Sequence, residues 1–254
     1  NKGDAPMQIL DAGCGTGLST NCLAHFNPGS EIKAVDISLN SINWLRVMGQ
    51  VSYYVWLTKQ FTSPINIAIP SGNFGNAYSA WFGRLHGLPI SEILCSTNVN
   101  DVLRRFIEGG VLEPLVTKPS VAPSMDIQIP SSLERLIFDL SSEAKDFYSQ
   151  LQNSSKAHLD EKSFGVLKHI FSSVTFSDDM IKTLITSLHD DFDIIFDPHS
   201  VTSVQMALEK QSSLPTVAVA TASPEKFGNV ISPLIDSFSD SAIDENEEYL
   251  TLST

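Results

Sequence analysis

The sequence has few cysteines and none of the common metal-ligand spacings. Its 254 residues include only Cys14, Cys22 and Cys95. An odd, sparse set of this kind indicates free thiols in a reducing compartment, not a disulfide framework. The spacings Cys-x-x-Cys and His-x-x-x-His do not occur, so we predict no metal site.

Basic residues and long apolar runs are also scarce. Lysine and arginine number 16 against 29 acidic residues, a net charge of −13, so we expect neither nucleic acid nor an anionic membrane as a partner. No apolar run reaches the roughly 18 residues that a membrane span needs. The opening NKGDAPMQ lacks the basic start and apolar core of a secretory signal, and it does not follow an initiating Met. We therefore expect a cytoplasmic protein, or one of an organelle stroma, and a segment of a longer product.

Apolar β-branched runs alternate with amphipathic helical patterns along most of the chain. The expected strands are residues 65–69, 93–96, 193–196 and 216–220. This order predicts an α/β fold with a mostly parallel sheet flanked by helices. We divide the chain into an N-terminal unit (1–38), a main region (39–238) with a helical insert at about 131–189, and an acidic tail (239–254) that we expect to be disordered.

The stretch INIAIPSGNFGN, residues 65–76, predicts a strand, a glycine turn and the start of a helix. Helical spacing then continues through Tyr78, Trp81, Phe82 and Leu85. Glycines let a backbone approach a ligand closely, and a helix N-terminus directs N–H groups at an anion. The turn is therefore a candidate phosphate cradle. An ordinary strand-to-helix turn is the alternative that the local pattern leaves open.

A different glycine pattern, DAGCGTG, lies near the N-terminus. It follows a short strand and precedes a helix, and Asp36 ends a second strand about 20 residues after the last glycine. This Rossmann-like βαβ unit resembles motif I of class I S-adenosylmethionine (SAM)-dependent methyltransferases. The resemblance implies that SAM would contact Asp11, Gly13, Gly15, Gly17 and Asp36. No later methyltransferase motif follows, so a βαβ unit without the rest of a SAM pocket is the alternative.

From about Leu39 onward the chain resembles the C-terminal portion of threonine synthase. The resemblance rests on IPSGNFGN, on GLPISEILCSTNVNDVLRRF and on TVAVATASPEKF. That family has the fold-type II pyridoxal-phosphate (PLP) architecture, also called tryptophan synthase beta-like. The implied phosphate-binding residues are Gly72, Asn73, Phe74, Gly75 and Asn76, and Thr221 is implied to bond the pyridine nitrogen. Candidate substrate residues in LNSINWLR are Asn40, Ser41, Asn43 and Arg46, although for each of them a helix cap or a place in an amphipathic core helix is the better explanation.

The resemblance is incomplete at the position that matters most for catalysis. PLP enzymes attach the cofactor to a lysine as a Schiff base, and the family's Phe-Lys-Asp segment is not found in these residues. Ser223 also replaces the usual histidine. By ancestry the implied reaction converts O-phosphohomoserine and water to threonine and phosphate. We expect the 254 residues alone to be inactive or nearly so, with no catalytic residue assigned and PLP held non-covalently or lost.

Two other hypotheses belong to different classes. The first is a SAM-binding, methyltransferase-like protein, and the second is a non-catalytic chimera or fragment. The sequence makes no prediction of oligomeric state.

Overall fold

A parallel four-stranded sheet forms the centre of the computed structural model, which describes residues 8–12, 31–35, 44–236 and 238. The strands are β3 (Ile65–Pro70), β4 (Ile90–Thr97), β7 (Phe171–Thr175) and β8 (Thr216–Ala218), in the order β7-β4-β3-β8. Every neighbouring pair runs parallel. The predicted fold class, a mostly parallel sheet flanked by helices, is confirmed.

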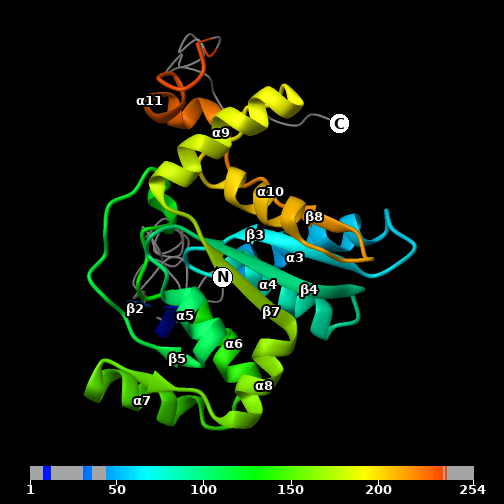
Figure 1. The fold of residues 1–254 in the computed structure, drawn as a ribbon. Helices are drawn as coiled ribbons and strands as arrows, with labels where there is room; N and C mark the ends of the chain where they lie inside the picture. The colour runs from blue at the N-terminus through cyan, green and yellow to red at the C-terminus, as the bar shows by residue number, and fades with distance from the viewer. Residues whose placement is uncertain (1–7, 13–30, 36–43, 237, 239–254) are drawn as a thin grey trace, which may run out of the picture.

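The central strand β3 is buried at every position because helices cover both of its faces. Ile65, Ile67 and Ile69 face the large core beneath α3 (Trp44–Thr58) and α4 (Gly75–Leu85). Ala68, on the opposite face, packs with Met206 of α10 (Ser200–Glu209). Figure 1 shows α10 on one side of the sheet and α3 and α4 on the other.

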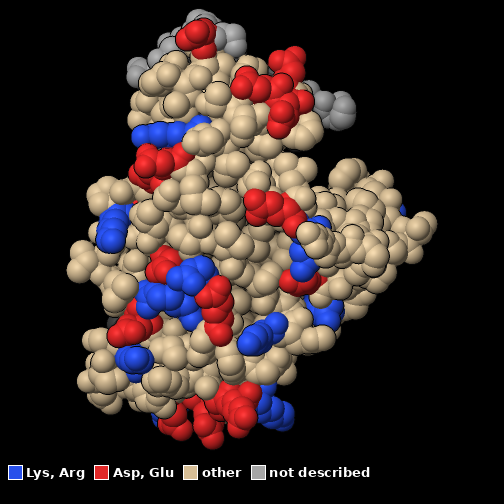
Figure 2. All heavy atoms as spheres, in the orientation of Figure 1, with Lys and Arg blue, Asp and Glu red and all other residues tan. Residues whose placement is uncertain are grey.

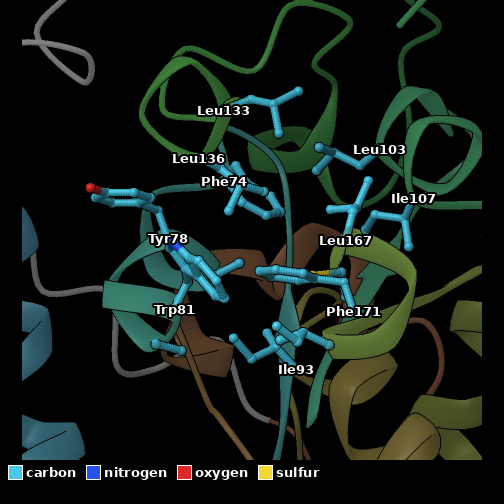
Figure 3. Close-up of a cluster of buried hydrophobic side chains, with 14 of the residues drawn as sticks. Phe74, Tyr78, Trp81, Ile93, Leu103, Ile107, Leu133, Leu136, Leu167 and Phe171 are labelled. Atoms are coloured by element: carbon cyan, nitrogen blue, oxygen red, sulfur yellow. The ribbon is translucent and has the colours of Figure 1, made fainter. Parts of the chain in front are cut away.

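The large core extends from the sheet to α5 (Val102–Gly109), α6 (Leu133–Leu140) and α8 (Glu161–Ile170). Its centre is aromatic: the ring of Phe171 lies 5.6 Å from that of Phe74 and 6.1 Å from that of Trp81 (Figure 3). This packing fixes the start of α4 against β7.

The remaining elements lie around the sheet and the helices that cover its two faces. They are β5 (Val111–Leu112) and β6 (Ala157–His158), paired antiparallel, η1 (Pro123–Met125), α7 (Ala144–Ser154), α9 (Asp178–Phe192), η2 (Pro224–Phe227) and α11 (Gly228–Ile231). A second, smaller core lies among η1, α9, α10 and α11; its members include Met125, Ile181, Ile185, Val201 and Ile231.

The N-terminal strands form a separate sheet. β1 (Gln8–Ala12) pairs in parallel with β2 (Glu31–Val35), and Asp11 lies opposite Ala34. Parallel pairing is what a βαβ unit requires. The other candidate SAM residues, Gly13, Gly15, Gly17 and Asp36, lie outside the described residues, as does the acidic tail.

Two strand assignments differ from the expectation. Residues 193–196 are not a strand: Asp193 takes a left-handed conformation (φ 55°) after α9, and the following residues pair with no described strand. Conversely, the stretch expected to be a helical insert contains β7, which pairs with β4. The run FSSVT follows α8 directly, without a glycine or proline to mark the change, so the sequence carries no break signal there.

The surface carries both signs of charge. On the face shown in Figure 2, basic and acidic side chains are interspersed, and neither sign covers a large area alone. No helix in the described part of the chain is long and apolar enough to cross a bilayer. Within those same residues, no cluster of three or more His, Cys, Asp or Glu side chains is arranged to hold a metal ion.

Candidate functional site

A hollow of about 410 Å³ opens beyond the carboxyl end of β3. In parallel α/β sheets, ligands commonly bind at this end of the strands. Three segments line the hollow: the turn and first residues of α4 (71–77), one side of α3, and the loop from Pro123 to Ser132. The contributions of α3 are Arg46, Val47 and Gln50.

The turn presents a row of backbone N–H groups. Ser71 N–H donates to the carbonyl of Ser96 at 2.8 Å, which anchors the turn to β4. From residue 72 to residue 77, by contrast, no described residue accepts a hydrogen bond from the backbone N–H. The last three of these N–H groups belong to the first turn of α4, at the positive end of its dipole. This arrangement suits an anion.

Phe74 holds the turn in a conformation that non-glycine residues rarely adopt. It is the N-cap residue of α4, with φ 67° and ψ 6° in the left-handed region. Its side chain is 2% exposed and packs against Phe171. Strained residues of this kind persist only where packing determines them, and they cluster at functional sites. The aromatic core thus sets the direction of the N–H groups.

Gly72 is required for a reason other than the one we expected. A Cβ at this position would lie 2.5 Å from the carbonyl oxygen of Ser124 and 3.2 Å from Cα of Met125. The missing side chain therefore lets η1 close against the turn and form the wall of the hollow. At Gly75 a Cβ would make only ordinary contacts, the nearest at 3.6 Å from Ser132 Oγ.

Two tyrosines of α3 orient Asn76. The hydroxyls of Tyr53, at 2.6 Å, and of Tyr54 both donate to the Asn76 side-chain oxygen. Burial raises the pKa of Tyr53 to about 12 and raises that of Tyr54 well above its ordinary value. Both hydroxyls therefore stay protonated at neutral pH and remain donors. The contact ties the start of α4 to α3.

Thr221 lies at the same edge of the sheet as the turn. Ala218 of β8 pairs with Ala68 of β3, and the N–H of Val219 donates to the Ala68 carbonyl at 2.9 Å. Ser71 and Thr221 each follow this pair by three residues. The backbone N–H of Thr221 donates to Ser200 Oγ at 2.9 Å, and its side chain is exposed.

The structure brings together only part of the predicted site. The turn and Arg46 line one hollow, whereas Thr221 lies beside it. Asn40, Ser41 and Asn43 lie outside the described residues. The sequence did not single out Gln50, Ser124 or Ser132 as cavity residues. The available signal was the segment PSMDI, whose Asp126 accepts hydrogen bonds from Asn98, Asn100 and Ser120 and so holds this loop in place.

Among the described residues that line the hollow, Arg46 is the charged one and no lysine is present. Cys95, in the adjacent strand β4, is fully buried, and that burial raises its thiol pKa to about 12. The thiol therefore stays protonated and is no nucleophile. Backbone N–H groups and the positive charge of Arg46 make the described hollow suited to an anion.

The chain thus combines a parallel sheet with an anion-suited turn between β3 and α4, and the exposed Thr221 lies at the same edge of that sheet. No family model matches the chain. Threonine synthase from Pseudomonas aeruginosa is 33% identical over 204 residues, covering 77% of this chain and 44% of the relative. Threonine synthase from Saccharomyces cerevisiae is 28% identical over 260 residues, covering 90% of this chain and 50% of the relative.

Solved structures agree. The PLP-bound threonine synthase of Brucella melitensis matches with a TM-score of 0.74 and 28% identity, over 91% of this chain and 51% of that one. The yeast enzyme also gives a TM-score of 0.74, with 27% identity over 85% of this chain and 47% of that one. The chain is therefore similar to threonine synthases in sequence, and its mostly parallel fold matches that of their solved structures. The chain spans about half the length of the threonine synthases it matches.

Proposed function

We propose that the hollow beyond β3 binds the phosphate of PLP and belongs to a threonine synthase-like lyase acting on O-phosphohomoserine. The observation that carries this proposal is the row of backbone N–H groups from residue 72 to residue 77. No described residue accepts a hydrogen bond from them, and these residues line a hollow of about 410 Å³. Backbone N–H groups at a helix N-terminus are well suited to a phosphate.

The other residues of the site fit the same cofactor. Arg46 would add a positive charge near the phosphate, since it lines the same hollow as the turn. Thr221, at the same edge of the sheet, would offer a neutral hydroxyl to the pyridine nitrogen. Bound PLP would supply an electron sink for chemistry at the α-carbon of an amino acid. Of the four candidate substrate residues, Arg46 is the one that lies within the described residues.

We infer that these residues hold PLP without a covalent bond. No lysine lines the described hollow. The 254 residues alone are therefore expected to bind PLP while showing little or no conversion of O-phosphohomoserine. A non-catalytic chimera or fragment would also be inactive. The two hypotheses differ in PLP binding, which our proposal expects and the chimera hypothesis does not.

The SAM interpretation has weaker support. The parallel pairing of β1 and β2 is compatible with a βαβ unit, but the comparisons lend no support to a SAM site. SAM binding stays a prediction of the sequence motif.

The proposal is tested by comparing PLP with pyridoxal, which lacks the phosphate. Affinities are measured by absorbance or fluorescence titration of the full chain. Since hydrogen bonds to charged groups contribute about 1.5–3 kcal/mol each, we expect PLP to bind at least about tenfold more tightly than pyridoxal, and inorganic phosphate to compete with PLP. Arg46→Gln should weaken PLP binding. Lys59→Gln, a matched loss of charge at an exposed position directly after α3, should not.

Two results would contradict the proposal. Equal affinity for PLP and pyridoxal would show that the turn does not recognise phosphate. Borohydride reduction of the PLP-loaded chain, followed by peptide mass mapping, should leave no stoichiometric adduct. A full adduct on one lysine would overturn the non-covalent part.

A further inference from the structure

A buried acid–histidine pair lies behind the wall of the hollow. Asp197 and His199, in the loop before α10, are 1% and 3% exposed. His199 Nδ1 lies 2.8 Å from Asp197 Oδ1, and the same carboxylate accepts the backbone N–H of His199 at 2.9 Å. The remaining carboxylate oxygen accepts the N–H of Ser200 at 3.3 Å. This pair is therefore held rigidly at the start of α10.

The partners of His199 define its tautomer. Its other ring nitrogen, Nε2, accepts the backbone N–H of Ser124 at 3.1 Å. A nitrogen that accepts must carry a lone pair, so Nε2 is unprotonated and the single ring proton resides on Nδ1, where it is donated to Asp197. Neither ring nitrogen remains available to a substrate. The histidine is thus fully used as a connector.

The connector reaches both parts of the candidate PLP site. Ser124 belongs to η1, the wall that lies against Gly72. A Cβ on Gly72 would come within 2.5 Å of the Ser124 carbonyl oxygen. Ser200, directly after His199, accepts the N–H of Thr221 through Oγ at 2.9 Å. One short segment, residues 197–200, therefore contacts the phosphate side and the pyridine side.

We propose that His199, in the Nδ1-protonated form held by Asp197, is a positioning residue that keeps η1 closed over the turn, while Ser200 keeps the Thr221 backbone in register. The link to PLP rests on the proposed function, but the contacts themselves do not. In this role His199 touches neither cofactor nor substrate. Its contribution is the acceptor that it presents to Ser124.

Two substitutions separate the acceptor from the donor. His199→Gln can place an oxygen near the Nε2 position and keep the bond from Ser124. His199→Asn can reach Asp197 but leaves the Ser124 N–H without an acceptor. We expect hydrogen exchange of the Ser124 amide to be about tenfold faster in His199→Asn, the effect of one lost hydrogen bond, and to stay within about threefold of wild type in His199→Gln. The Met125 amide, bonded to the Ala122 carbonyl, should be affected less than the Ser124 amide, and the β4 amides should be unaffected.

The wild-type chain provides a second measurement that needs no variant. ¹⁵N NMR of histidine-labelled protein at neutral pH should show Nδ1 protonated and Nε2 bare. A proton on Nε2, or equal exchange of the Ser124 amide in the two variants, would overturn the inference. A uniform rise in exchange across β4 would reduce His199 to a general stabilising residue. Neither measurement uses PLP, so failure of cofactor binding with the expected exchange pattern would refute the proposed function alone.

Discussion

At Gly72 the turn and η1, the wall of the hollow, lie in close contact. The contact is between two backbones, because the atoms that a Cβ would meet are the Ser124 carbonyl and Cα of Met125. A backbone cannot move aside as a flexible side chain can. The site therefore depends on the absence of one methyl group.

We predict that Gly72→Ala lowers the free energy of unfolding by about 1–3 kcal/mol, the usual cost of overpacking, and weakens PLP binding by displacing η1. Urea denaturation measures the first effect and titration the second. Gly49→Ala is the control: its Cβ would meet nothing within 4 Å in the middle of α3, so it should stabilise by about 0.5–1 kcal/mol. Wild-type stability in Gly72→Ala would contradict the contact.

At the same scale, the sequence predicted which residues form the turn but not what each one does. Glycine and asparagine after a strand indicate a turn, because of their backbone preferences. That Gly72 makes room for η1 depends on Ser124, more than 50 residues later in the chain, and no local pattern reports such a contact. The left-handed backbone conformation of Phe74 could not be predicted from the sequence either, because a non-glycine residue disfavours it.

Helices α6 and α8 are joined through their ends. Asp160, the N-cap residue of α8, accepts the backbone N–H of Ser163 at 2.9 Å. Its other oxygen accepts the hydroxyl of Ser141 at 2.9 Å, at the C-terminal end of α6. One carboxylate thus closes the start of one helix and the end of another.

We predict that Asp160→Ala destabilises the fold by about 1–2 kcal/mol, because a lost cap exposes an unsatisfied N–H. Asp160→Asn keeps an acceptor oxygen and should lose less. Glu161→Ala, an exposed acidic residue in the same first turn, should change stability by less than about 0.5 kcal/mol. Thermal and urea denaturation decide the order. If Glu161→Ala and Asp160→Ala are equally destabilised, helix-dipole charge and not capping explains the effect.

Element prediction succeeded where apolar runs were continuous and bounded. β3, α4 and β4 were expected at almost their observed places because Pro70 and two glycines mark the change of structure. It failed at residues 193–196 and at β7. The first is an apolar run that packs in the smaller core without strand pairing. The second is a serine-containing run whose strand partner within the described residues, β4, lies about 80 residues earlier.

Acidic residues outnumber basic ones in the molecule as a whole, and the carboxylate of one of them, Asp197, is buried. Burial by itself would raise the pKa of Asp197, but hydrogen bonds from His199 and Ser200 outweigh it and lower the pKa. Because the folded pKa lies below the unfolded value of about 3.9, the ionised carboxylate stabilises the fold above that pH. This stability is lost as the pH falls through the folded pKa.

We therefore predict that the difference in unfolding free energy between wild type and Asp197→Asn is largest near neutral pH and shrinks as the pH falls below about 4. Urea denaturation at several pH values measures it. Asp191→Asn, at an exposed position near the end of α9, should give a difference that is small at every pH. If the difference in unfolding free energy between wild type and Asp197→Asn stays constant with pH, the charge of this carboxylate does not contribute to the stability of the fold.

The complete site could not be derived from the chain alone. Motif resemblance singled out the turn, Arg46 and Thr221 as candidate residues, since each lies in a recognisable segment. The hollow exists because α3, the turn and the loop from Pro123 to Ser132 converge, and that convergence is a property of the assembled sheet and its two layers.

The order of strands in the sheet also affects how the chain is made. β3 is internal, but its partner β8 is encoded about 150 residues later, with Asn66 bonded to Thr216. At roughly 5–20 residues per second, a ribosome takes about 8–30 s to bridge that gap. Throughout this interval the Ile65–Pro70 backbone has one open hydrogen-bonding edge, a template for wrong pairing. Expression yield of this protein is thus expected to depend on chaperones that shield β3 until β8 has emerged.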